Sequence, residues 1–284
     1  MSKIVFATDA KPPTLAALPL VASLARRLGA DVDLLHVPQS GTEPRGEAAA
    51  ALDEAVGQLQ RGGLDGRVVS KPAANAADAV REHAGEVSAE LVAVVGRSGE
   101  KLLDRLLGST THDLIDDPPT DLLVVSRDHA PKHTAVRRCL VPVNFGDESI
   151  RCLELAARLT EPGGEVVLLF NVPANFPAFH GARGLESDYK NAEQLEANWR
   201  SDLEAFWDRY GSPDHRPVIV RSEGSWHQEA EVAAEKHGCD LVVAAEADGV
   251  VRRGLAEKLA AKLAVCPAVI ARFDSGSVAH RETT

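Results

Sequence analysis

The sequence of 284 residues lacks several features that would assign it to particular classes of protein. Its four cysteines form no Cys-x-x-Cys pair, and their spacing fits no zinc-ligand pattern. No stretch approaches the roughly 20 apolar residues of a membrane-spanning helix. The first residues also lack the long apolar segment of a signal peptide. We therefore expect reduced, buried cysteines and a cytoplasmic protein that does not act at a membrane.

An excess of positive charge is also absent, because the net charge is −11. This balance argues against a nucleic acid or an anionic membrane as the main partner. It does not exclude a phosphate ligand, since backbone amides and a few Arg or Lys side chains act locally.

Motifs of efficient catalysis are missing as well. The sequence contains no Walker A motif and no His-Glu-x-x-His pair. No Ser-His-Asp or Cys-His arrangement can be recognised from spacing, and no base or electrophile clamp for phosphoryl transfer is evident. Any ATP turnover would therefore be slow and incidental.

The first half of the chain alternates between segments typical of strands and segments typical of helices. The strands are short, continuous and rich in Val and Leu, as expected for a parallel sheet covered on both faces. They are predicted at residues 3–8, 31–37, 67–70, 91–95 and 122–126. Helices are predicted between them at residues 14–28, 47–59, 76–84 and 110–115. This alternation predicts a doubly wound sheet with parallel crossovers.

The second half repeats the same order of elements, so the chain is predicted to be a tandem duplication. The fold class is therefore α/β, with two tandem doubly wound domains that each contain a five-stranded parallel sheet flanked by helices. We place the domains at residues 1–128 and 137–274, with a linker at 129–136 and a tail at 275–284. A long helix of the second copy carries Trp199, Phe206 and Trp207 on one face. Core packing is the favoured interpretation of these aromatic residues, and a ligand pocket or dimer interface is the alternative.

The stretch from Val94 to Thr111 carries the strongest chemical signal. An apolar strand ends at Gly96, Gly99 follows, and Gly108-Ser109-Thr110 comes after a further eight residues. Glycines after a buried strand allow the backbone to approach a ligand closely. A helix start with Ser and Thr provides free N–H groups that favour an anion. The stretch therefore predicts a nucleotide site or the remains of one, although a tight turn needing glycine for geometry alone is the alternative.

The second copy differs at the corresponding positions. Asn144 replaces Asp9, and Glu246 stands where the first copy has Gly96. A carboxylate at a phosphate site would repel the anion by about 1 kcal/mol or more. The second site therefore looks disabled for a nucleotide.

These residues resemble the universal stress protein family, here as two fused domains. The resemblance rests on residues 4–9, on Leu34 to Val37 and on the glycine-rich stretch, and in the second copy on residues 140–143 and 266–270. It implies a Rossmann-like, adenine nucleotide alpha hydrolase-like fold that binds ATP, ADP or AMP, with or without Mg²⁺. It also implies that the two domains pair within the chain, with a homodimer as a further possibility.

Carried onto this sequence, the resemblance implies a set of nucleotide-binding residues. They are Thr8, Asp9, Val37, Gly96, Arg97, Gly99, Gly108, Ser109 and Thr110. Asp9 would lie near the adenine and ribose, and Val37 would offer its main chain to the base. The spacer before Gly108 has eight residues, whereas the family signature has nine.

Two other functions stay open beside a regulatory nucleotide-binding protein of the stress response. The shortened spacer favours an interaction module of the same fold that binds no nucleotide, and a weak ATPase is the remaining alternative. Arg97, Lys101 and Arg105 are candidate phosphate contacts or solvated cations of a helix face. Asp104 is a weak Mg²⁺ candidate, because a single exposed carboxylate seldom suffices.

Overall fold

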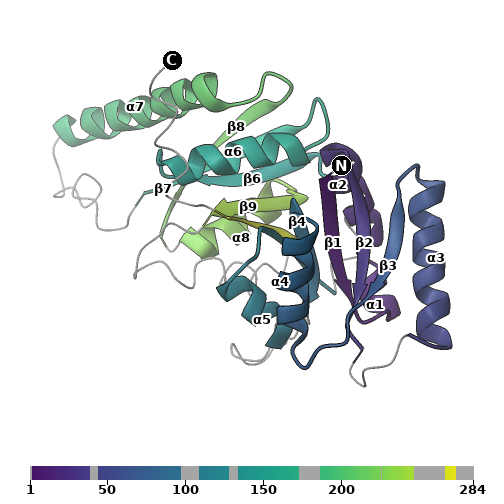
Figure 1. Cartoon of the computed structure of the whole chain (residues 1–284). Helices are drawn as coiled ribbons and strands as arrows, with labels where there is room; N and C mark the ends of the chain where they lie inside the picture. Colours follow the sequence, from purple (N-terminus) through teal and green to yellow (C-terminus); the bar gives the residue numbers. More distant parts are fainter. Residues whose placement is uncertain are drawn as a thin grey trace, which may run out of the picture.

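One continuous sheet of ten strands forms the centre of the protein (Figure 1). The computed structural model describes residues 2–38, 44–96, 109–127, 134–172, 186–224, 226–245 and 266–272. The strand order is β3-β2-β1-β4-β5-β10-β9-β6-β7-β8. The first half provides Ser2–Thr8 (β1), Ala30–His36 (β2), Gly66–Ser70 (β3), Leu91–Gly96 (β4) and Asp121–Ser126 (β5). The second half provides Arg138–Val143 (β6), Glu165–Val172 (β7), Arg216–Glu223 (β8), Leu241–Ala245 (β9) and Ala268–Ala271 (β10).

Helices cover both faces of this sheet. Those of the first half are Pro12–Leu15 (α1), Leu18–Leu28 (α2), Glu47–Arg61 (α3), Ala76–Glu86 (α4) and Ser109–Asp116 (α5). Those of the second half are Asp147–Leu159 (α6), Glu186–Tyr210 (α7) and Trp226–Lys236 (α8). The largest core cluster joins one face of the sheet to α2, α3, α6 and α7. On the opposite face, α4 and α5 cover the first half and α8 covers the second.

The two halves meet through an antiparallel pair, β5 with β10, whereas the other strand pairs are parallel. Each half has the same internal strand order, running outward from this seam. On one face, α2 packs against α6 across the seam, so a single apolar core runs through both halves. The prediction of two tandem five-stranded sheets is confirmed, and the structure adds that they fuse into one mixed sheet.

Polar contacts reinforce the seam. The buried carboxylate of Asp121 accepts a hydrogen bond from Arg151 Nη2 at 2.6 Å and another from the backbone N–H of Arg272 at 2.9 Å. Burial raises the pKa of Asp121, and the charge of Arg151 offsets only part of that rise. Nearby, Arg158 forms an ion pair with Glu90 of the other half. Both contacts join side chains from opposite halves, so they stabilise the pairing of the halves.

The first helical region departs from the prediction of one helix at residues 14–28. It is split into α1, which ends at Leu15, and α2, which begins at Leu18. Pro19 lies in the first turn of α2, and its ring would clash with the carbonyl of residue 15 in a continuous helix. The predicted end is correct, because Gly29 closes α2 in a left-handed conformation with φ of +62°.

A buried ion-pair network fixes β2, β3 and α4 in the first half. Asp33 is fully buried, and its carboxylate oxygens accept hydrogen bonds from Arg67 at 2.8 and 2.7 Å. His83 Nε2 donates to the same carboxylate at 2.9 Å. Burial alone would raise the pKa of Asp33, but the hydrogen bonds from Arg67 and His83 lower it overall. Asp33 is therefore an ionised residue inside an otherwise apolar layer.

Candidate functional site

The candidate site lies at the carboxyl ends of the first-half strands. From β1 the chain continues to β2 on one side, and it later returns to β4 on the other side of β1. Open parallel sheets bind their ligands at such a reversal of strand order, beyond the carboxyl ends of the strands. Asp9 follows β1, Val37 follows β2, and Gly96 is the last residue of β4. The topology therefore brings these three predicted residues to one edge.

A tight turn after β1 positions Thr8 and Asp9. The Thr8 hydroxyl accepts the N–H of Ala10 at 3.0 Å. Asp9 Oδ1 accepts both the N–H of Lys11 at 3.1 Å and the hydroxyl of Thr14 at 2.6 Å. Ala10 has a φ of +60°, a left-handed conformation that is unfavourable for a residue with a Cβ. The turn therefore occupies one carboxylate oxygen of Asp9 and leaves the other for different partners.

That second oxygen, Asp9 Oδ2, faces two cations. Lys11 Nζ and Arg127 Nη2 each lie 3.5 Å from it. Partial burial would raise the pKa of Asp9, but the Thr14 hydroxyl, the Lys11 N–H and the two positive charges lower it overall. Asp9 is therefore ionised at neutral pH, and Oδ2 can accept a hydrogen bond from a ligand hydroxyl.

The end of β2 forms the neighbouring part of this edge. Val37 is half-buried and packs against the core cluster beneath α4 and α5. His36 is paired with Thr8 in the sheet, and its Nδ1 lies 3.1 Å from the Thr8 carbonyl oxygen. His36 therefore contributes to the structure of this edge.

The glycine-rich stretch is described at its two ends. Gly96 is buried and paired with Ser126, and its carbonyl accepts the N–H of Arg127 at 3.3 Å. Ser109 is the exposed first residue of α5, and Thr110 follows it half-buried. Because α5 packs against β4 and β5 and leads back to the start of β5, its first turn lies toward the candidate edge.

Arg97, Gly99 and Gly108 are predicted site residues that lie outside the described residues, as do Lys101, Asp104 and Arg105. Three other residues were missed by the sequence analysis although they shape the site: Lys11, Thr14 and Arg127. The sequence could have indicated Arg127, because this residue directly follows β5 and must therefore lie at the same edge as Asp9. Nothing in the sequence pattern indicates Thr14, since its contact with Asp9 depends on the geometry of the turn.

The second half repeats the turn with different chemistry. Asn144 Oδ1 accepts the N–H of Gly146 at 2.9 Å and the hydroxyl of Ser149 at 2.7 Å, which are the same two contacts that Asp9 makes. Phe145 has a φ of +63° and takes the place of Ala10. The turn geometry is thus conserved between the halves, but the charge is lost.

Aromatic rings fill this part of the second half. The Phe145 ring lies 5.3 Å from that of Phe170 and 5.5 Å from that of Phe206, between ring centroids. Phe170 also contacts Trp199, and Trp207 packs against the main core. The interpretation of the α7 aromatic residues as packing residues is supported by these contacts. The second edge is therefore bulky and apolar where the first is small and charged.

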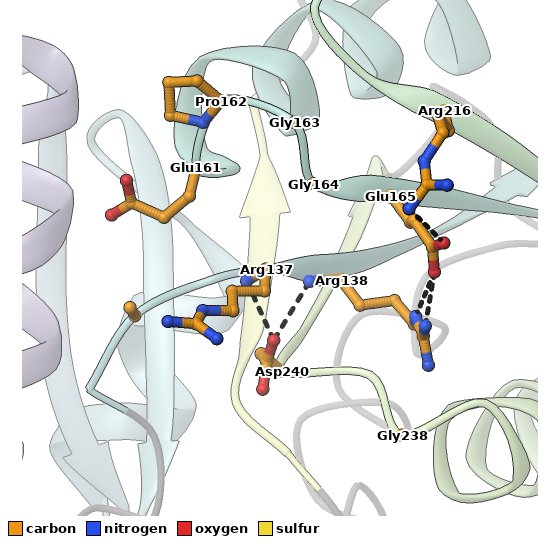
Figure 2. A pocket seen from close by; sticks show the side chains of 11 residues that line it. Arg137, Arg138, Glu161, Pro162, Gly163, Gly164, Glu165, Arg216, Gly238 and Asp240 are labelled. Carbon is orange, nitrogen blue, oxygen red and sulfur yellow. Dashed lines mark hydrogen bonds and ion pairs between the residues drawn. The ribbon is translucent and has the colours of Figure 1, made fainter.

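A separate hollow of about 740 Å³ lies at the amino ends of the second-half strands (Figure 2). Several of its charged groups already have partners. Glu165 forms ion pairs with Arg138 and Arg216, and Asp240 Oδ2 accepts the backbone N–H groups of residues 137 and 138 at 2.9 and 3.0 Å. These contacts join the starts of β6, β7, β8 and β9, so we interpret the hollow as a structural junction.

Two further classes of site are absent from the described part of the chain. No cluster of three or more His, Cys, Asp or Glu side chains there could hold a metal ion. None of the helices there has the length and apolar character needed to cross a membrane. The four cysteines are free and buried, as expected.

The doubly wound halves, with a polar turn at the switch point, define an α/β protein built from two similar halves. The profile of the Universal stress protein family matches residues 1–126. Residues 1–126 are therefore similar to the universal stress protein family, and the fold of the whole chain is similar to that of a universal stress protein of known structure.

Solved structures resemble the chain over nearly its full length. A universal stress protein from Archaeoglobus fulgidus is 16% identical, with 95% of this chain and 98% of that chain covered and a TM-score of 0.65. A protein of unknown function from Pseudomonas aeruginosa is also 16% identical, with 97% and 94% covered and a TM-score of 0.65. A shorter universal stress protein, solved in complex with cAMP, is 25% identical, with 44% and 97% covered and a TM-score of 0.38. A search of curated protein sequences finds no match.

Proposed function

We propose that the first half of this protein binds an adenine nucleotide at the carboxyl edge of β1, β2 and β4. We further propose that occupancy of this site regulates how the protein engages its partners during a stress response. ATP, ADP and AMP are all candidates. The cAMP complex described above belongs to another protein, so the assignment here depends on this chain's own residues and on the family to which they are similar.

The observation that carries the proposal is the state of Asp9. The turn holds its carboxylate ionised and engages only Oδ1, while Oδ2 lies beside two cations and the side chain as a whole is 38% exposed. A ribose hydroxyl is a suitable donor for such an oxygen. The first turn of α5 lies toward the same edge, where its free N–H groups favour phosphate oxygens.

The second half supports this assignment to the first half alone. Its corresponding turn carries the neutral Asn144 and the bulky Phe145, with aromatic rings packed behind them. A nucleotide entering there would meet no carboxylate for its ribose, and it would face the ring of Phe145 in place of the small side chain of Ala10. We therefore expect one nucleotide per chain.

Isothermal titration with ATP and AMP tests the proposal, together with mass spectrometry of any small molecule that co-purifies. Asp9→Asn is the informative variant, because Asn144 shows that an amide can make the same two turn contacts. We expect this variant to stay folded and to bind the nucleotide about tenfold more weakly, since a charge-assisted hydrogen bond is lost.

The matched control is Asn144→Asp, which places the charge in the other half and should leave nucleotide affinity unchanged. Wild-type protein that binds no adenine nucleotide would overturn the proposed function. The shortened spacer would then favour the interaction module that binds no nucleotide.

A further inference from the structure

Arg127 is a charged residue of the candidate edge that the predicted set of ligand-binding residues does not include. It is the first residue after β5, and its backbone N–H donates to the carbonyl of Gly96 at the end of β4. From there its side chain reaches Asp9 after β1, with Nη2 lying 3.5 Å from Oδ2. The guanidinium thus spans the end of β4, directly beside the start of the glycine-rich stretch.

The contact between Arg127 and Asp9 leaves both groups able to bind something else. A separation of 3.5 Å is longer than the roughly 2.7–2.9 Å of a strong charge-assisted hydrogen bond. Arg127 is 30% exposed at its side chain, and its buried Nε has no hydrogen-bond partner among the described residues. The guanidinium therefore has unused donors at the edge where a ligand is expected.

We propose that Arg127 makes this site selective for phosphorylated ligands, by neutralising Asp9 in the free protein and pairing with phosphate oxygens in the complex. The inference rests on the proposed function. A neutral nucleoside would have to compete with two cations for Asp9 Oδ2 and would offer them nothing in return. A nucleotide supplies a hydroxyl donor for Asp9 and anionic oxygens for Arg127. Each of the two residues therefore gains a ligand partner in place of the contact between them.

The surroundings of Arg127 favour an anion as its new partner. The eight-residue helix α5 points its first turn toward this edge, and its N-terminal partial positive charge adds to that of the guanidinium. Lys11 provides a second cation, with its Nζ 3.5 Å from Asp9 Oδ2. In the second half, Asn144 stands at the position of Asp9 and has no charge to neutralise.

Titration calorimetry with AMP and adenosine tests this inference, using the full chain and the variant Arg127→Met. We expect wild-type protein to bind AMP at least about tenfold more tightly than adenosine. In Arg127→Met, AMP affinity should fall about tenfold, while adenosine affinity stays the same or rises because Asp9 is released from one competitor. The ratio of the two affinities is the diagnostic quantity, since a general loss of structure would weaken both ligands together.

Two companion variants sharpen the experiment. Arg127→Lys retains the positive charge and should recover part of the preference for AMP. Arg61→Met removes an exposed arginine that pairs with Glu54 on α3, and it should leave both affinities unchanged.

The outcomes separate the two proposals. If wild-type protein binds AMP and Arg127→Met keeps the wild-type ratio, Arg127 does not sense phosphate, and the proposed function still stands. If Arg127→Met weakens AMP and adenosine equally, its role is structural and the inference is wrong. If wild-type protein binds neither ligand, the proposed function fails and the inference fails with it.

Discussion

The two carboxyl edges of the sheet share one turn but differ in what the turn presents. In the first half, Asp9 uses one oxygen for the turn and carries a charge, and the small residue Ala10 follows it. In the second half, Asn144 makes the same contacts without a charge, and the aromatic residue Phe145 follows it. The comparison teaches that the Asp or Asn at this position is required by the backbone, whereas only the first half combines that requirement with an ionised group.

The same contrast exists within the sheet. The register places Val167 and Val218 of the second half at the positions of Asp33 and Arg67 in the first. One half therefore contains a buried ion-pair network where the other has apolar side chains. Buried ion pairs are often no more stabilising than well-packed hydrophobic residues of similar volume, but losing one partner is costly.

Separating the two halves should have the largest effect on the protein. A fragment of residues 1–128 would expose the edge of β5 and the face of α2 that packs against α6. We expect this fragment to self-associate, because both surfaces are apolar or have unpaired backbone groups. Size-exclusion chromatography with light scattering would detect the association. A stable monomer with native secondary structure would show that the shared core contributes little.

Replacing Arg67 should have the next largest effect. The variant Arg67→Met leaves the buried Asp33 carboxylate with His83 and a more distant lysine, so we expect a loss of about 2–3 kcal/mol in the free energy of unfolding. Urea denaturation at neutral pH measures this loss.

The control for Arg67→Met copies the second half. A triple variant, Asp33→Val, Arg67→Val and His83→Ala, follows Val167, Val218 and the buried Ala233 of α8. It should recover most of the stability, because no charge is left buried. If it is less stable than Arg67→Met, the first half depends on its ion pair in a way that the second half does not reveal.

Removing the Thr14 hydroxyl tests the charged turn more finely. In Thr14→Val, the pKa of Asp9 should rise, because burial raises it and the strongest lowering contact is gone. Since the folded pKa of Asp9 lies below its ordinary value of 3.8, its contribution to stability is present above that pH and is lost as the pH falls further. The stability difference from wild type, about 1–2 kcal/mol at neutral pH, should therefore shrink in acid. NMR titration of the carboxyl carbons and denaturation at several pH values measure both effects.

Ser149→Ala is the corresponding variant of the second half. It removes the hydroxyl that contacts Asn144, which does not titrate. Its effect on stability should be the same at neutral and acidic pH. A pH-dependent loss in this variant would contradict the proposed difference between the turns.

The smallest expected effect concerns the cysteines, all of which belong to the second half: Cys139, Cys152, Cys239 and Cys266. Burial raises the pKa of all four thiols, for example to about 12 for Cys152. We expect iodoacetamide to leave the native protein almost unlabelled, because the thiolate is the reactive form. Since Cys139 and Cys152 lie in the core that joins both halves, their labelling should track global unfolding of the chain. Faster labelling would show that the second half opens by itself.

The architecture was largely predictable from the sequence, because alternating apolar strands and amphipathic helices leave few parallel topologies. The break between α1 and α2 was also encoded, in Pro19, but the periodicity of the surrounding apolar residues masked it. The antiparallel seam was not predictable from residue pattern, since β5 and β10 look like any other buried strands.

The candidate site was predictable only where residues directly follow strands. Asp9, Val37 and Gly96 were placed correctly at one edge on this basis. Some contacts depend on the exact backbone conformation of a turn, such as the hydrogen bond from Thr14 to Asp9. No spacing of residues in the sequence indicates such a contact. The network of Asp33, Arg67 and His83 likewise joins residues that are 34 and 50 positions apart.

The β5–β10 seam has a consequence for how the two copies can diverge. In a symmetric pair of identical chains, every substitution occurs twice, so a ring like that of Phe145 would obstruct both edges at once. When both copies belong to one polypeptide, each copy can acquire its own substitutions, although the two copies still pair in the same way. One copy is then free to keep a polar opening, and the other can become a permanent scaffold for it.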